Sequence, residues 1–138
     1  MKKAMMTLVF VMLLVGLAAQ YVPVEIVNQA EDRNGKALVS KFREIIRNSS
    51  AYQISYDSES PHFVVQIDTI DRYKGDSEWE GLSTIYHYMI LIDPGDQMRV
   101  LCTNQLGYVG ANLLDQVAYG IYSDLDDFVE MMIYYIEN

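Results

Sequence analysis

The sequence predicts an α+β fold, a two-layer sandwich in which a three- to four-stranded antiparallel sheet is covered on one face by two helices. Apolar residues alternate along segments 62–70 and 84–92, which predicts neighbouring strands. Apolar residues recur at helical spacing along 36–48 and from about residue 112 onward, which predicts one helix before the sheet and one after it. A sheet with one apolar side needs a single covering layer, so we expect the order α-β-β-β-β-α with both helices on the same face.

The first 19 residues have the features of a secretory signal peptide. Lys2 and Lys3 give a basic start, an apolar run of 16 residues follows, and the small pair Ala18-Ala19 precedes an expected cleavage between Ala19 and Gln20. The alternative is an uncleaved anchor, but the run is shorter than the roughly 20 residues that span a bilayer. We therefore expect an exported protein of bacterial type, periplasmic or extracellular, with no membrane insertion after cleavage.

The charge balance excludes several classes of partner. The chain has 138 residues with 10 Lys+Arg and 19 Asp+Glu, and loss of Lys2 and Lys3 leaves eight basic side chains, a formal charge of −11. Such an acidic protein is not expected to bind nucleic acid or anionic lipid. The single cysteine, Cys102, excludes a disulfide scaffold. Its place in an apolar strand indicates a buried thiol, and the alternative is an intermolecular partner.

The residues after the cleavage site begin with an extended segment. Residues 21–27 are interrupted by Pro23, which lacks an amide hydrogen and therefore belongs at a sheet edge or before a strand. We interpret 20–35 as an N-terminal linker and 36–138 as a single domain. A helix over 36–48 follows, capped by Asp32 or by Asn34. Its apolar stripe consists of Leu38, Phe42, Ile45 and Ile46.

Four strands are expected next. Residues 52–56 form a short strand with an edge that is free, covered by the linker or paired with a second copy. Residues 62–70 have one apolar face, and 84–92 are apolar on both faces and therefore central. The tetrapeptide Asp93-Pro94-Gly95-Asp96 predicts a type II turn with Gly95 at positive φ, so 97–103 returns antiparallel.

A long final helix ends the chain. Gly107 to Gly110 form a connection that ends the sheet, and Asn112 with Asp115 resembles a capping box. The apolar stripe of this helix consists of Leu114, Val117, Ala118, Ile121, Leu125, Phe128, Met132 and Ile136.

The acidic loop over residues 71–81 is the first candidate site. Tyr73 and Trp79 are residue types that anchor protein interfaces, so we predict that they contact a protein partner. The carboxylates of this loop suggest an alternative, a weak site for a hard divalent cation formed by Asp76, Glu78 and Glu80. A loop that is simply solvated is the third interpretation.

The tyrosines are the second candidate site. The chain has 11 of them, and Tyr86 and Tyr88 share one strand face, where we predict partner contacts. The connection 107–110 is an alternative anion site, since a helix begins behind it. If Ile70 opposes Thr84, then His87 opposes Ile67 and His62 opposes Ile92.

No catalytic motif, nucleotide-binding loop or metal-binding signature occurs in the sequence. We therefore expect a non-enzymatic exported binding or accessory protein that contacts another protein and has no cofactor. The alternative function is a periplasmic protein that binds a small ligand or a divalent cation. A hydrolase would need His87 beside a carboxylate in a pocket.

Overall fold

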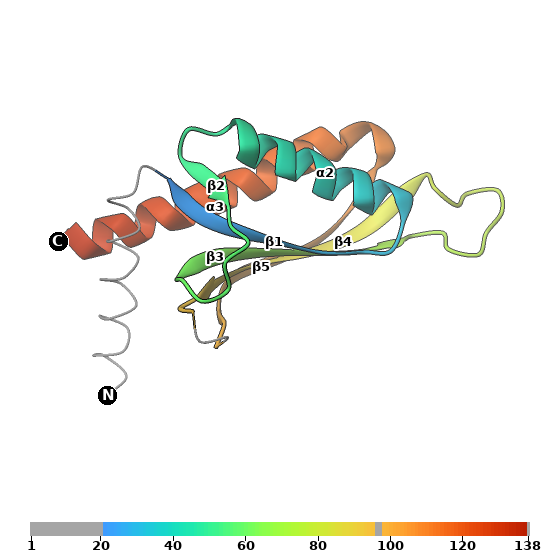
Figure 1. Cartoon of the computed structure of the whole chain (residues 1–138). Coiled ribbons are helices and arrows are strands. Elements are labelled where there is room, and N and C mark those ends of the chain that lie inside the picture. The colour runs from blue at the N-terminus through green and yellow to red at the C-terminus, as the bar shows by residue number, and fades with distance from the viewer. Residues whose placement is uncertain (1–20, 96–97, 138) are drawn as a thin grey trace.

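A computed structural model describes residues 21–95 and 98–137, which form one five-stranded mixed sheet with two helices on one face (Figure 1). The strand order is β2-β1-β3-β4-β5. The elements along the chain are β1 (Val22–Ala30), α2 (Arg33–Asn48), β2 (Tyr52–Ile54), β3 (His62–Asp71), β4 (Ser83–Asp93), β5 (Val100–Gly110), the short 3-10 helix η1 (Ala111–Leu113) and α3 (Leu114–Glu137).

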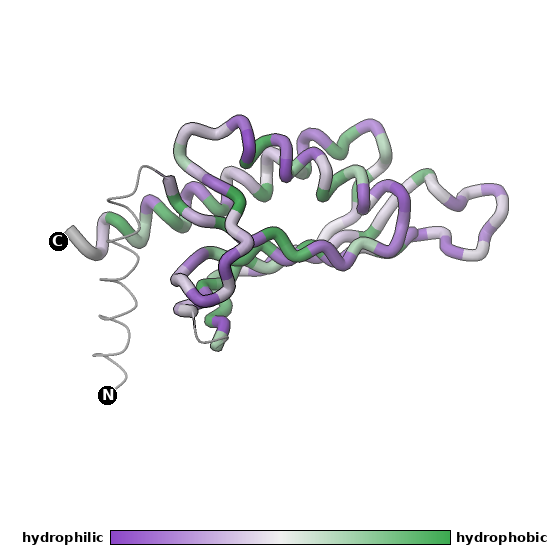
Figure 2. Tube along the Cα trace, viewed as in Figure 1, coloured by the Kyte–Doolittle hydropathy of each residue, from purple (hydrophilic) through white to green (hydrophobic). Residues whose placement is uncertain are grey.

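The α+β class and the shared helix layer are confirmed. The apolar stripe of α2 is buried at Leu38, Phe42 and Ile46, and Asp32 caps the helix by accepting from the Gly35 amide at 3.2 Å. The stripe of α3 is buried over five turns, from Leu114 to Met132, and Figure 2 shows apolar positions recurring along both helices. The buried residues of α3 are Leu114, Ala118, Ile121, Leu125, Val129 and Met132. Val129 was not predicted to belong to the stripe, whereas the predicted Val117 and Phe128 are only partly buried.

The expectation of a purely antiparallel sheet with three or four strands is wrong at the N-terminal end. The segment interpreted as a linker is β1, which lies inside the sheet and runs parallel to both β2 and β3. A 16-residue helix brings the chain back to the starting end of β1, so β2 and β3 run parallel to β1. The observed order is therefore β-α-β-β-β-β-α, and the domain begins before residue 36.

Pro23 lies inside β1, and its lack of an amide hydrogen leaves no backbone acceptor of a neighbouring strand unpaired. The Val22 amide donates to Ala51 O at 2.8 Å and the Ser55 amide donates to Val24 O at 2.8 Å, so these residues direct their peptide groups toward β2. The Pro23 nitrogen therefore points toward the β3 side, where pairing begins only at Val24. The missing amide hydrogen removes no ladder bond, which explains why proline is accepted in an inner strand.

The predicted register between β3 and β4 is wrong by one residue. The Arg72 amide donates to Ser83 O at 3.0 Å and Asp71 pairs with Thr84, so Ile70 opposes Ile85. The same shift places His87 opposite Asp68 and His62 opposite Asp93.

Strand β5 is longer than expected and ends differently. It extends from Val100 to Gly110, so residues 107–110 belong to the strand and form no anion-binding connection. The expected turn is present in its described part, since Gly95 has a φ of 94°. The predicted capping box is absent, because α3 begins at Leu114 after η1 and Asp115 instead pairs with Lys41 at 2.6 Å.

The predicted signal peptide, with its cleavage between Ala19 and Gln20, lies outside the described residues. In residues 21–95 and 98–137 no helix has the length and apolar character needed to cross a membrane.

Candidate interaction surface

The sheet has an open face that neither helix covers. In β3 the side chains of Phe63, Val65 and Ile67 are buried under the helices, so the alternate residues point to the opposite side. Cross-strand partners arrange this open face in rows across β3, β4 and β5. The two rows nearest the β3–β4 loop are Ile70, Ile85 and Tyr108, followed by Asp68, His87 and Leu106.

The first row is apolar and exposed. Ile70 and Ile85 are both exposed, and Tyr108 at the sheet edge retains 70% of its accessible surface. Leu106 in the next row is equally exposed at 70%. Because adjacent members are paired across strands, their side chains lie within contact distance and form one patch rather than scattered residues.

The aromatic residues of the β3–β4 loop continue this patch. The Arg72 guanidinium lies 4.8 Å from the ring centroid of Tyr108 and 5.3 Å from that of Tyr73. Tyr73 in turn lies 6.2 Å from Trp79, measured between ring centroids. The structure thus brings the two predicted loop residues together with Tyr108, which was not among the predicted contact residues.

The loop has a defined conformation because Asp71 holds both of its ends. The Asp71 carboxylate accepts from the Tyr73 amide at 2.7 Å and from the Gly81 amide at 2.6 Å. The Asn34 side-chain amide donates to Gly81 O at 2.8 Å, which ties the loop to the start of α2. In Figure 1 the loop extends beyond the ends of both helices.

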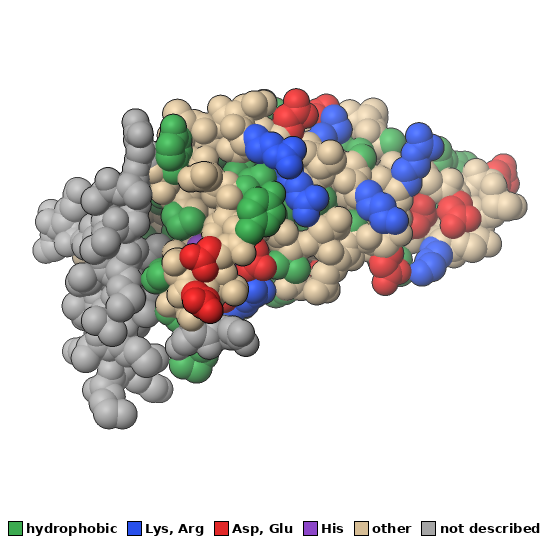
Figure 3. All heavy atoms as spheres, in the orientation of Figure 1, with side chains coloured by type: hydrophobic (Ala, Val, Ile, Leu, Met, Phe, Trp, Pro, Cys, Tyr) green, Lys and Arg blue, Asp and Glu red, His purple; other side chains and the backbone are tan. Residues whose placement is uncertain are grey.

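We refer to Ile70, Ile85, Leu106, Tyr108, Arg72, Tyr73 and Trp79 together as the open-face patch. Its rim is mainly acidic, since Asp76, Glu78 and Glu80 are exposed in the same loop, beside the exposed Lys74. Figure 3 shows acidic and basic side chains gathered at this end of the molecule. An apolar centre with a charged rim is the usual anatomy of a protein interface.

Tyr86 and Tyr88 do not belong to the open-face patch. Their rings stack at 6.4 Å on the opposite sheet face, beneath α3, and Tyr88 is only 2% exposed. The Tyr88 hydroxyl bonds to the Asp124 carboxylate and to Gln105 Oε1 at 2.7 Å. Burial, followed by the bond to Asp124, raises the pKa of the Tyr88 phenol. The Tyr88 side chain is therefore part of the packing between the sheet and α3 and is not exposed.

This environment gives a first prediction. Tyr88→Phe removes the hydroxyl and leaves the Asp124 carboxylate without that donor, so we expect the free energy of unfolding to fall by about 1–3 kcal/mol. The matched control is Tyr86→Phe, for which we expect a smaller loss because Tyr86 is half-buried. Urea unfolding of the two variants measures the difference, and equal losses would contradict the role assigned to the Tyr88 hydroxyl.

The predicted cation ligands remain dispersed. Asp76 Oδ1 accepts from the Glu78 amide at 3.0 Å within its own turn. Among the described residues, no group of three or more His, Cys, Asp or Glu side chains is close enough to hold a metal ion.

His87 lies beside a carboxylate on the open face. Its Nδ1 is 3.5 Å from Asp68 Oδ2, and about a third of each side chain is exposed. None of the described cavities includes this pair among its lining residues. The arrangement is a half-buried contact between an imidazole and a carboxylate that borders the open-face patch.

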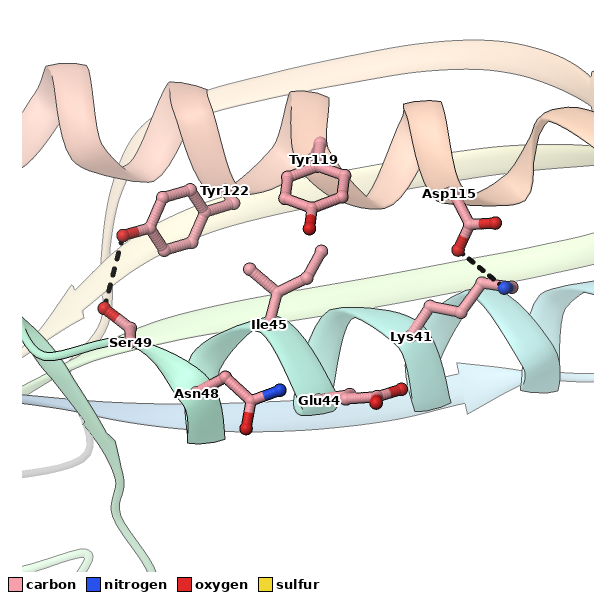
Figure 4. A pocket seen from close by; sticks show the side chains of 8 residues that line it. All are labelled: Lys41, Glu44, Ile45, Asn48, Ser49, Asp115, Tyr119 and Tyr122. Carbon is pink, nitrogen blue, oxygen red and sulfur yellow. Dashed lines mark hydrogen bonds and ion pairs between the residues drawn. The ribbon is translucent and has the colours of Figure 1, made fainter.

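Two of the cavities that the described residues line lie beside α3. One, of about 440 Å³, is an open groove between α2 and α3, closed at its ends by Lys41 with Asp115 and by Ser49 with Tyr122 (Figure 4). Tyr119 of α3 points toward α2 in its middle. The other, of about 330 Å³, lies between β4, β5 and α3 and is lined by Tyr86, Tyr88, Gln105, Gln116, Gly120, Asp124 and their neighbours.

Cys102 is half-buried rather than fully buried. It lies at a bulge of β5, where the pairing with β4 shifts between Ile90 and Leu91. Burial raises the pKa of its thiol to about 11, which keeps it in the unreactive protonated form at neutral pH.

Comparison with family models and with curated proteins gives no match. Among solved structures, the chain is similar to rare lipoprotein B from Shewanella oneidensis, with a TM-score of 0.42 and 10% sequence identity. The alignment covers 81% of this chain and 98% of that protein.

Proposed function

We propose that this chain is a non-enzymatic exported binding or accessory protein that contacts another protein through the open-face patch. The observation that carries the proposal is the continuity of the patch. Exposed apolar side chains of three strands join the loop aromatic residues through Arg72, which lies within 5.3 Å of the ring centroids of both Tyr73 and Tyr108. Large aromatic residues and arginine supply most of the binding energy in protein interfaces.

The rim of the patch indicates the chemistry of the partner. The formal charge of the chain is −9, and the β3–β4 loop carries exposed carboxylates beside its aromatic residues. A partner surface with an apolar centre and a basic rim complements this arrangement, and opposite charges accelerate association. We therefore expect an association rate that falls as ionic strength rises.

The proposal predicts that two aromatic residues control binding. In affinity capture of the tagged protein from its native envelope and culture fluid, we expect Trp79→Ala and Tyr108→Ala to lose a protein that the wild type retains. With that protein purified, each variant is expected to weaken binding by about tenfold or more. Isothermal titration calorimetry measures the dissociation constants.

The matched control is Tyr56→Ala, because Tyr56 is an equally large and highly exposed side chain (88%) outside the patch. It should bind as tightly as the wild type. Retention of the same protein by Trp79→Ala and Tyr108→Ala would contradict the proposal, as would an equal loss with Tyr56→Ala.

A further inference from the structure

The strand at the end of the sheet, β5, has an unusual sequence for an edge. Its 11 residues from Val100 to Gly110 include no charged side chain and no proline. Edge strands normally carry such residues because an exposed apolar edge pairs with other chains. The other edge of the sheet, β2, has only three residues and offers little backbone for pairing.

The backbone groups on the outer side of β5 follow from the ladder. Because the Arg72 amide donates to Ser83 O, Asp71 and Thr84 are a non-hydrogen-bonded pair, and the pairing alternates from there. Even-numbered residues of β4 therefore bond toward β5, where they face odd-numbered residues from 103 to 109. The N–H and C=O groups of Asn104, Leu106 and Tyr108 consequently point away from the sheet.

The bulge at Cys102 hinders pairing with another strand only at the N-terminal end of β5. Beyond it, pairing with β4 is regular from Thr103 to Gly110. The stretch that contains the outward backbone groups is therefore regular, and its open-face side chains Leu106 and Tyr108 are both 70% exposed.

We propose that β5 pairs antiparallel with β5 of a second copy, about a two-fold axis at Leu106, to form a continuous ten-stranded sheet. In this register Leu106 exchanges two backbone hydrogen bonds with Leu106 of the partner subunit, and Asn104 does so with Tyr108 of the partner subunit. All of these are outward-pointing residues, so both ladders close without unpaired groups.

The side chains are complementary to themselves in this register. On the open face leucine meets leucine, and on the helix face Thr103 meets Val109 of the partner subunit, a favourable β-branched pair. Gln105 faces Gly107 of the partner subunit, so a long side chain meets a residue without one. A chain of net charge −9 repels its copies at most of its surface, and the uncharged strand is where this repulsion is weakest.

The dimer goes beyond the proposed function, because it uses the backbone edge of β5 and leaves the open-face patch of each copy on the same side of the joined sheet. The two patches would then meet at Leu106 and form one larger surface. A monomer that still binds its partner through Trp79 and Tyr108 would refute the dimer alone, whereas a dimer without a partner would refute the proposed function alone.

The first test is the mass of the purified exported protein by analytical ultracentrifugation. We expect a dimer for the wild type and a dissociation constant raised by at least about tenfold for Leu106→Lys, which places two like charges at the axis. The matched control Leu82→Lys introduces the same charge at an exposed leucine of the β3–β4 loop and should remain dimeric. A monomeric wild type, or a Leu106→Lys dimer of unchanged affinity, would overturn the proposal.

The second test fixes the register by disulfide formation in a Cys102→Ser background. Facing residues of a hydrogen-bonded pair have Cα atoms about 5.5 Å apart, within the range that a disulfide spans. Leu106→Cys is therefore expected to cross-link two copies under oxidation. Asn104→Cys is expected not to, because the two Asn104 positions are offset by four residues, about 13 Å along the strands. Cross-linking through Asn104→Cys alone, or of Leu106→Cys to a different protein, would refute the two-fold register.

Discussion

Gly35→Ala is expected to destabilise the protein by about 2 kcal/mol, although alanine is the better helix former. A Cβ atom at Gly35 would lie 1.6 Å from Thr69 Oγ1 and 2.7 Å from Asp32 Oδ1. The Thr69 hydroxyl donates to Asp32 at 2.5 Å, and Asp32 caps α2. The added methyl group therefore forces β3 and α2 apart and disturbs the cap, which outweighs the gain in helix propensity.

Gly120→Ala is the matched control, with an expected effect of opposite sign. Gly120 lies inside α3, and a Cβ atom there would meet nothing within 4 Å. We expect this variant to gain about 0.5–1 kcal/mol from helix propensity alone. Urea unfolding with unchanged m-values measures both effects. A Gly35→Ala variant as stable as Gly120→Ala would show that the contact between α2 and Thr69 is loose.

The helix layer could be predicted from the sequence because each helix has one apolar stripe. Leu38, Phe42 and Ile46 recur at helical spacing and are all buried, and Ile121 and Leu125 of α3 behave in the same way. These positions depend only on local periodicity, which is readable without knowing the partner element. The parallel pairing of β1 with β2 and β3 is not local, because it depends on α2, which packs on the sheet and returns the chain to the starting end of β1.

The predicted end of β5 is wrong because glycine occurs both in turns and inside strands where a neighbouring side chain lies close to the backbone. Gly107 suggested a turn, but a Cβ atom there would lie 2.5 Å from the Tyr86 hydroxyl oxygen. The glycine therefore allows a neighbouring ring to lie across the strand, and β5 continues through it. Because the predicted strand ended before residue 106, Leu106 and Tyr108 were not predicted to lie on a sheet face.

The candidate site was predictable only in part for a similar reason. Tyr73 and Trp79 stand out by residue type in an acidic loop, and the structure places them beside Tyr108. Ile70 and Ile85 alternate like core residues, and no periodic pattern reveals which face of a sheet remains uncovered. Tyr86 and Tyr88 were assigned to a contact surface for their residue type, and they lie on the helix-covered face.

Asp93→Asn is expected to show that a charged cluster around the buried Asp93 carboxylate stabilises the β4–β5 turn. Asp93 is almost fully buried, accepts from the Gly95 amide at 2.9 Å and pairs with Arg99 Nε at 3.2 Å. Arg99 also pairs with Glu25 at 2.8 Å, and Glu25 faces His62 Nε2 at 3.1 Å. Loss of the Asp93 charge leaves Arg99 with one carboxylate, so we expect a loss of about 2–3 kcal/mol at neutral pH.

The pH dependence identifies the charge as the cause. Burial raises the pKa of Asp93, but the Gly95 amide, Arg99 and His62 lower it by more, so the folded-state pKa lies below the usual value. A depressed pKa means that the stabilisation is fully present above the unfolded value, about 3.9, and is lost as pH falls through the folded one. The stability difference between wild type and Asp93→Asn should therefore shrink below about pH 4.

A double-mutant cycle of Asp93→Asn with Arg99→Met separates the ion pair from general damage at the turn. The coupling energy between the two sites should be favourable at pH 7 and should decrease in acid, because protonated Asp93 no longer attracts the guanidinium. A coupling energy near zero at both neutral and acid pH would mean that Asp93 acts through its hydrogen bond from the Gly95 amide and not through Arg99. In that case the turn would be stabilised by the hydrogen bond at Gly95 and not by the charge of Asp93.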